Sequence, residues 1–135
     1  MSECILCKIK NLEIPNYTVY EDDYVLAFLD INPHAKGHTV VIPKKHIENL
    51  KDVCKEDWSN VLEGVRQATK RIEEVLKPDG INIGINDREV AGQVVPHIHF
   101  HIFPRFDGDG GGSIHSIINN KGEVEVEEVA KLFNQ

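Results

Sequence analysis

One seven-residue stretch limits what this chain can fold into more than any other, because histidines and apolar residues alternate along it. The stretch reads His97-Ile98-His99-Phe100-His101-Ile102-Phe103. A period of two is typical of a β-strand, in which successive side chains point to opposite faces of the sheet. The pattern predicts a strand with three imidazoles on one face, ~6.6–7 Å apart, and three apolar side chains in the core. A slip of one residue would bury all three imidazoles, so the pattern strongly favours one register.

The rest of the chain predicts a small α+β domain around this strand. Runs rich in β-branched and aromatic residues predict further strands at residues 18–21, 24–30, 38–43 and 81–86. Apolar residues at helical spacing predict a long helix from Asp57 to Lys77 and a short amphipathic helix within 123–135. We therefore expect one domain, residues 1–135, with an antiparallel sheet of about five strands, one long helix and a short C-terminal helix.

Residues 107–112, Asp-Gly-Asp-Gly-Gly-Gly, are rich in glycine and follow the histidine strand closely. A phosphate-binding P-loop needs Gly-Lys-Ser or Gly-Lys-Thr at the start of a helix, and this segment has neither. We therefore predict that residues 107–112 form a flexible connector.

Charge and cysteine content narrow the classes of function. The 135 residues carry a formal net charge of −7, which argues against binding to a nucleic-acid backbone, because such binding needs a basic face. A small nucleotide is still allowed, since it needs only local donors. No apolar run approaches the ~20 residues of a membrane span, and the N-terminus does not resemble a signal peptide. With three cysteines, a disulfide framework is not expected, so we predict a cytoplasmic protein with no membrane or nucleic-acid partner.

The alternating histidines His97, His99 and His101 are compatible with two functions, metal binding and nucleophilic catalysis. Simple solvation explains them poorly, because solvent-facing strand positions usually carry other polar residues. All three could bind one metal ion, as His-x-His pairs do in zinc hydrolases. Alternatively the middle imidazole is a nucleophile, since an unperturbed pKa near ~6.5 leaves much of it neutral at pH 7.

Three segments together resemble the histidine triad family. The family signature is His-φ-His-φ-His-φ-φ, with φ apolar, and residues 97–103 match it in full. Residues 30–46, DINPHAKGHTVVIPKKH, are similar to the family's central strand region, and Ile85-Asn86 with residues 91–94 are similar to its approach to the triad. The resemblance runs from about Cys4 to Arg105. It implies nucleotide binding with cleavage or transfer at the α-phosphate.

The resemblance also implies roles for single residues. His99 would be the nucleophile that forms a nucleotidyl-histidine intermediate, His101 would hydrogen-bond the phosphate or leaving group, and His38 would orient the triad. The nucleotide-binding positions are Phe28, Leu29, Asp30, Ile31, Asn86, Gln93, Val94, His99 and His101. The carboxylate of Asp30 would accept hydrogen bonds from ribose hydroxyls. The apolar residues of this set could equally be plain core, and Gln93 could simply satisfy loop backbone.

Val94 is a departure from the family pattern. Many relatives carry Ser or Thr directly after the position of Gln93, where a hydroxyl can donate to the phosphate. Val94 offers only its backbone N–H. Loss of one transition-state donor costs ~10²–10³ in rate in other enzymes, so the departure bears on catalytic strength.

The spacing Cys4-x-x-Cys7 is half of a tetrahedral zinc site. The resemblance implies the other half, because family members with this N-terminal pair, and the related uridylyltransferases, use positions that match His46 and His97. We therefore expect zinc as a structural cofactor on Cys4, Cys7, His46 and His97. The alternative is a cysteine pair left over from a lost site.

The leading hypothesis is a nucleotidyl hydrolase or transferase that acts on nucleoside phosphoramidates or dinucleoside polyphosphates. Its partner would be a purine nucleotide such as AMP, or another adenosine-containing substrate. Two alternatives stay open: a metallohydrolase with the three histidines as zinc ligands, and a nucleotide-binding module with weak catalysis. The family also implies a homodimer, with the long helix and a sheet edge at the interface.

Overall fold

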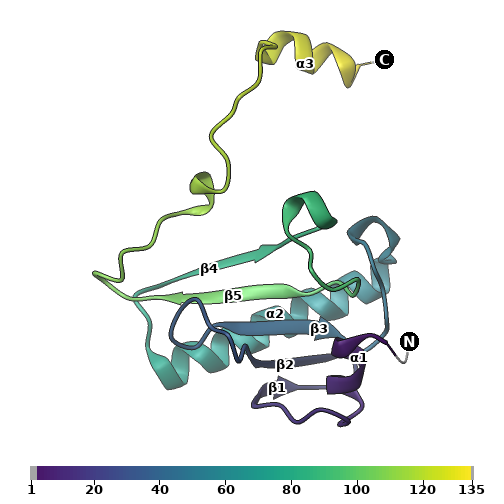
Figure 1. Cartoon of the computed structure of the whole chain (residues 1–135), viewed down its shortest axis with the longest axis vertical. Coiled ribbons are helices and arrows are strands. Elements are labelled where there is room, and N and C mark those ends of the chain that lie inside the picture. Colours follow the sequence, from purple (N-terminus) through teal and green to yellow (C-terminus); the bar gives the residue numbers. More distant parts are fainter. Residues whose placement is uncertain (1–2, 135) are drawn as a thin grey trace.

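The computed structural model describes residues 3–134 as a five-stranded sheet with a long helix against one face (Figure 1). Its helices and strands are α1 (Ile5–Lys10), β1 (Thr18–Glu21), β2 (Val25–Leu29), β3 (Thr39–Pro43), α2 (Lys55–Leu76), β4 (Gly80–Ile85), β5 (Phe100–Arg105) and α3 (Val126–Leu132). The strand order is β1-β2-β3-β5-β4, and every neighbouring pair is antiparallel. The predicted α+β class, the five strands and both predicted helices are confirmed.

Helix α2 packs its apolar stripe against one face of the sheet. The buried residues of this core are Val25, Ala27, Val41, Val61, Val65, Ala68, Ile72, Phe100 and Ile102. Gly64 lets the helix approach the sheet closely, because a Cβ there would lie 2.4 Å from Val25. The helix ends at Lys77, which takes the left-handed conformation at φ 52°, directly before Pro78. Helix and core together form a rigid support for the opposite face.

The opposite face of the sheet is only partly covered. Helix α1 lies over β2 and β3, where Leu6 packs with Phe28 and Val40 in a second group of buried apolar side chains. The sequence patterns above do not predict this helix. Its start is capped by the Sγ of Cys4, which accepts a hydrogen bond from the Cys7 N–H at 3.4 Å. The part of this face that α1 leaves open carries His99 and His101.

The predicted strand from His97 to Phe103 is wrong at its start. The regular ladder of β5 begins at Phe100, and the Ile98 N–H donates to the Ile47 carbonyl in a loop instead of to a strand partner. The alternation itself persists, since Ile98, Phe100 and Ile102 are all buried. His97 does not share an open face with the other two histidines, because its side chain is completely buried.

Most of the C-terminal segment lies apart from the rest of the chain, and only its start, at Ser113, Ile114 and Ile117, borders the cavity described below. Residues 113–134 are exposed throughout, and α3 stands off beyond the open edge of β4 (Figure 1). Exposed apolar side chains occur along it, among them Ile117, Leu132 and Phe133. The segment therefore buries almost none of its apolar surface against its own domain.

The glycine-rich loop at 107–112 is closed by one carboxylate. Asp109 pairs with the guanidinium of Arg105 at 2.8 Å and accepts the backbone N–H groups of Phe106 and Gly111. The flexibility of this loop stays a prediction. No helix of the described residues is long and apolar enough to cross a membrane.

Candidate functional site

A cavity of about 1450 Å³ opens on the partly covered face of the sheet. Its walls come from α1, from the end of β2 with the loop that follows, and from β4 and β5. His38, His99 and His101 all line it. The antiparallel pairing of β3 with β5 sets Val40 opposite His101, so the histidine that precedes β3 lies beside the triad.

His99 presents one free nitrogen to this cavity. Its Nδ1 lies 2.8 Å from the backbone carbonyl oxygen of His97. A carbonyl oxygen can only accept, so Nδ1 carries the ring proton and Nε2 keeps a lone pair. His99 is therefore held in the tautomer that a nucleophilic imidazole requires.

His38 and His101 form a hydrogen-bonded chain with a defined direction. The backbone N–H of His34 donates to Nδ1 of His38 at 3.2 Å, so the ring proton of a neutral His38 is on Nε2. That Nε2–H donates to Nδ1 of His101 at 2.9 Å. The proton of His101 is consequently on its own Nε2, which makes this atom a donor.

The electrostatics of the pair agree with this chain of neutral imidazoles. Burial lowers the pKa of His38, although the Asp30 carboxylate, 3.7 Å from its Nε2, opposes the shift. Burial, with the neighbouring His99 and His38, lowers the pKa of His101 to about 4. Both rings are therefore neutral at pH 7, and the Nε2–H of His101 is a hydrogen-bond donor that faces the cavity.

Most of the expected nucleotide-binding residues lie together around the cavity. Those that line it are Phe28, Leu29, Asp30, Ile31, Asn86, Val94, His99 and His101. Phe28 is both core and wall, since it is buried among the apolar residues under α1. Ile31 is largely exposed, which leaves it free to pack against a ligand. Their binding roles stay predictions.

Gln93 is the exception among these residues, because it is not part of the cavity wall. Its Oε1 accepts the Arg88 N–H at 2.6 Å, and its Nε2 donates to the Glu48 carbonyl at 2.8 Å. The Gln93 side chain thus hydrogen-bonds backbone groups of the loops. This agrees with the structural interpretation given above and not with a position in the cavity wall. Val94, the next residue, does line the cavity and is exposed.

The four expected metal ligands converge at the N-terminus of α1. Nδ1 of His97 lies 3.5 Å from Sγ of Cys4, 3.5 Å from Sγ of Cys7 and 3.2 Å from Nδ1 of His46. Sγ of Cys7 lies 3.3 Å from Nδ1 of His46. Ligand atoms of a tetrahedral zinc ion, at ~2.0–2.3 Å from the metal, are about 3.3–3.8 Å apart, so the spacing fits such an ion.

The protonation of His97 also fits a metal. Its Nε2 lies 2.9 Å from the Pro43 carbonyl oxygen, so Nε2 carries the proton and Nδ1 directs its lone pair at the two cysteines. Burial lowers the pKa of His97 to about 4, which keeps the ring neutral. Two thiols and two imidazoles are the donor set that structural zinc prefers.

The three alternating histidines therefore do not gather into one ligand set among residues 3–134. Two groups of side chains could hold a metal ion there: Cys4, Cys7, His46 and His97 in one, and Asp30, His38 and His101 in the other. His99 belongs to neither. The arrangement separates a cysteine-containing site from the residues of the cavity, and does not favour one metal shared by all three imidazoles.

Comparison with known proteins identifies the family. The model of the HIT domain matches residues 11–108. An uncharacterised HIT-like protein of Methanocaldococcus jannaschii is 50% identical over 95% of this chain and 96% of its own length. The chain belongs to the HIT family.

Two further HIT proteins bear on the site. The adenosine 5'-monophosphoramidase of Saccharomyces cerevisiae is 40% identical over 80% of this chain and 66% of its own length. A crystal structure of a HIT family member from Bacillus subtilis matches with a TM-score of 0.84 and 40% identity, covering 98% of this chain and 93% of the other. The HIT fold is thus shared over nearly the whole chain, including the residues that build the cavity.

Sequence reasoning missed parts of this HIT cavity. Ile5 and Ile9 of α1 line it, as do His34 and Lys36 in the loop between β2 and β3. The spacing of the apolar residues after Cys4 was the available signal for α1. His34 carries no local pattern, and only its place four residues before His38 brings it to the site.

Proposed function

We propose that this HIT protein is a nucleotide hydrolase that works through a nucleotidyl-histidine intermediate on His99. The observation that carries the proposal is the tautomer of His99, because its Nδ1–H is committed to the His97 carbonyl and its Nε2 is free. Nε2 attacks the α-phosphorus, an N–P bond forms, and the bond from phosphorus to the leaving group breaks. The Nε2–H of His101 gives its proton to the departing atom, and the Nε2–H of His38 hydrogen-bonds Nδ1 of the resulting anion. Water then attacks the same phosphorus and returns one proton to Nε2 of His101. The N–P bond breaks, and the nucleoside monophosphate and free His99 are released.

The substrate we propose is a nucleoside phosphoramidate of adenosine. Support comes from the relative in Saccharomyces cerevisiae, whose name describes that activity, and from the composition of the cavity. Phe28, Leu29 and Ile31 offer apolar surface to a base, and Asp30 offers carboxylate oxygens to ribose hydroxyls. A dinucleoside polyphosphate presents the same α-phosphate and is the second candidate substrate.

The test is turnover of a fluorogenic adenosine phosphoramidate. We expect the wild-type protein to release the fluorescent amine and the His99→Ala variant to lose at least ~10³ in rate, because no nucleophile is left. The matched control is His115→Ala, an exposed histidine on the C-terminal segment, which should keep full activity. Full turnover by His99→Ala would show that the nucleophile is wrong. Wild-type protein that binds AMP but is inert would favour a binding module instead.

We also propose that the cluster of Cys4, Cys7, His46 and His97 binds a structural zinc ion. The interatomic distances and the lone pair of His97 Nδ1 support it. Burial raises the pKa of the Cys7 thiol, so the thiolate needs a metal to stabilise it. Thiolate ligands persist in a reducing compartment, which is why we place the protein in the cytoplasm. A metallohydrolase would lose its chemistry on chelation even when its fold and nucleotide affinity are intact.

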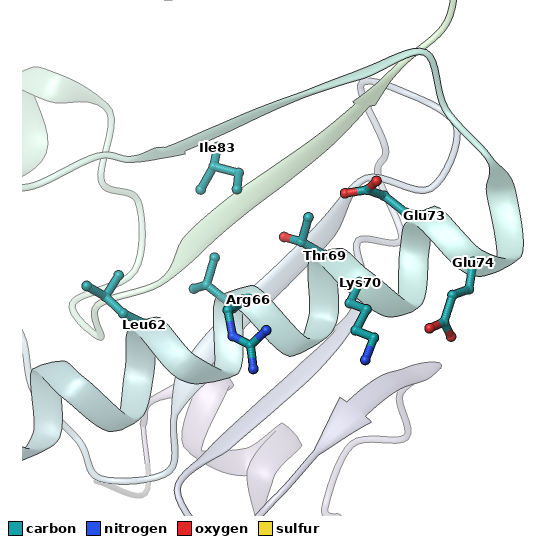
Figure 2. A pocket seen from close by; sticks show the side chains of 8 residues that line it. Leu62, Arg66, Thr69, Lys70, Glu73, Glu74 and Ile83 are labelled. Carbon is teal, nitrogen blue, oxygen red and sulfur yellow. The ribbon is translucent and has the colours of Figure 1, made fainter.

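Finally, we propose that the protein is a homodimer. Figure 2 shows a groove between α2 and β4, with Leu62, Thr69 and Ile83 facing it. Leu62 and Ile83 are exposed apolar side chains, and β4 is an edge strand with an unpaired side. A second copy that pairs along β4 would cover both, since exposed edges and apolar patches are usually protected by association.

A further inference from the structure

We propose that the ligand cluster of Cys4, Cys7, His46 and His97 positions the nucleotide site, so that metal occupancy controls nucleotide affinity. The inference rests on the proposed function and on the proposed zinc site. It goes beyond both, because a purely structural metal would stabilise the fold without acting on the cavity. Two separate connections run from the cluster to the cavity.

The first connection is α1, which is a wall of the cavity. Ile5, Leu6 and Ile9 line the cavity. Of the two cysteine ligands, Cys4 is the N-cap of this helix and Cys7 lies within it. Helix α1 has six residues, which is far too short to be stable alone in water. Its position depends on the burial of Leu6 and on Cys4 and Cys7, both of which are buried at its start. Freeing the cysteines would therefore loosen the apolar wall of the nucleotide site.

The second connection is His97, which acts at both sites. Its side chain belongs to the cluster, and its backbone carbonyl accepts the Nδ1–H of His99 at 2.8 Å. Residues 97–99 lie outside the regular ladder of β5, and the backbone N–H groups of His97 and Ile98 bond to loop carbonyls, those of Val95 and Ile47, instead of to a strand. The imidazole of His97, held between the Pro43 carbonyl and the cluster, is a principal anchor of this carbonyl. His97 is thus a positioning residue for the nucleophile.

Without a metal, only weak contacts within the cluster would fix helix α1 and the His97 carbonyl in place. Thiols are weak hydrogen-bond donors and acceptors, so the sulfur–nitrogen contacts at 3.3–3.5 Å are weak although their length is ordinary for sulfur. Thiolate and imidazole bonds to zinc are far stronger. Metal loss should therefore release α1 and the His97 carbonyl while the core between α2 and the sheet stays intact.

The experiment compares zinc-loaded and chelated full-length protein by AMP calorimetry and by hydrogen exchange. We expect chelation to weaken AMP binding by about tenfold, the lower end of the ~10–100-fold effect that partners of metal ligands have on metal affinity or activity, and zinc addition to restore it. Exchange should rise in residues 5–14 and at Ile98, while the buried centre of α2 does not change. Unchanged AMP affinity, unchanged exchange in residues 5–14, or protein that takes up no zinc would each overturn the proposal.

Variants at His46 separate positioning from general stability. His46 is half-buried and does not line the cavity. His46→Asn should reproduce the chelated state, and His46→Cys, which restores a ligand, should recover zinc-dependent AMP affinity. Cys54→Ser is the control, because Cys54 is exposed and outside the cluster, and it should behave as wild type. If zinc-loaded protein binds no AMP, the proposed function fails, and the exchange of residues 5–14 still decides the positioning role.

Discussion

At the scale of single residues, the hydrogen-bond partner of each imidazole decides which nitrogen carries a proton. His97 and His99 are two residues apart, yet the first is protonated on Nε2 and the second on Nδ1, because different carbonyls accept from them. His101 takes its tautomer from a third source, the Nε2–H of His38. These contacts explain how three identical side chains in one motif could take the three roles we propose, a metal ligand, a nucleophile and a proton donor.

Val94 is the residue at which a substitution should improve the enzyme. We expect Val94→Ser to raise kcat on an adenosine phosphoramidate by about tenfold or more, because it supplies a hydroxyl donor of the kind worth ~10²–10³ elsewhere. Val94 is exposed and lines the cavity, so the change leaves no void. The comparison is with Val90→Ser, an exposed valine on the neighbouring turn that is not part of the cavity wall. Equal rates for the two variants would contradict the prediction.

His101 should make the protein sensitive to acid. Its pKa falls from 6.5 to about 4 on folding, so between these values the unfolded chain binds a proton that the folded chain does not. The free energy of unfolding contributed by this neutral ring is present above pH 6.5 and is lost as the pH falls toward about 4. The measurement is urea unfolding at several pH values across that window.

The His101→Asn variant isolates this effect from other titrating groups. The groups near His101 are His99, His38, His34 and Asp30, and the variant keeps all of them. Its stability should fall less steeply with decreasing pH than that of the wild type. Parallel curves for the two proteins would mean that His101 does not titrate as described.

At the scale of elements, the sequence predicts those helices and strands whose pattern lies within one continuous segment. The apolar periodicity of α2 and the alternation along β5 are both visible in a short stretch of sequence. The predicted bounds of both elements differ from the observed ones by a few residues. Helix α1 was missed because six residues give too short a period. The burial of His97 was missed for another reason. Its partners Cys4 and His46 are 93 and 51 residues away in the sequence, so no local pattern contains them.

Gly37 forms the turn that leads into His38 and strand β3. It precedes His38 with φ +82°, and a Cβ there would lie 2.3 Å from Cδ1 of Leu76. We expect Gly37→Ala to reduce the free energy of unfolding by ~1–3 kcal/mol, from left-handed strain and overpacking. Gly80→Ala is the control, because its Cβ would meet nothing within 4 Å. Denaturant unfolding measures both, and equal effects would contradict the account of the turn.

At the scale of the whole molecule, exposed apolar surface gathers near the edge strand β4 in two places. The edge strand exposes Ile83 toward the groove against α2 (Figure 2), and the exposed C-terminal segment extends beyond the same edge (Figure 1). Both features leave apolar surface uncovered in a single copy. The proposed dimer would cover this apolar surface. The family resemblance implies a dimer, whereas no local sequence pattern predicts one.

Ile83→Asp should weaken the dimer. A charge placed on the proposed interface should cost about 2 kcal/mol or more, which is ~30-fold in dissociation constant. Sedimentation measures this as a shift toward the monomer at a fixed concentration. Leu12→Asp is the control, because Leu12 is exposed after α1 and away from the groove. A wild-type protein that sediments as a monomer would refute the dimer.

The central claim is that His99 carries the nucleotide between the two displacements. The most direct measurement is mass spectrometry of protein quenched in alkali during turnover of an adenosine phosphoramidate, since the N–P bond of a phosphohistidine is labile in acid. The account predicts one adenylyl adduct, mapped to the peptide that contains His99 and absent from His99→Ala. Turnover without an adduct, or an adduct on His97 or His101, would contradict it.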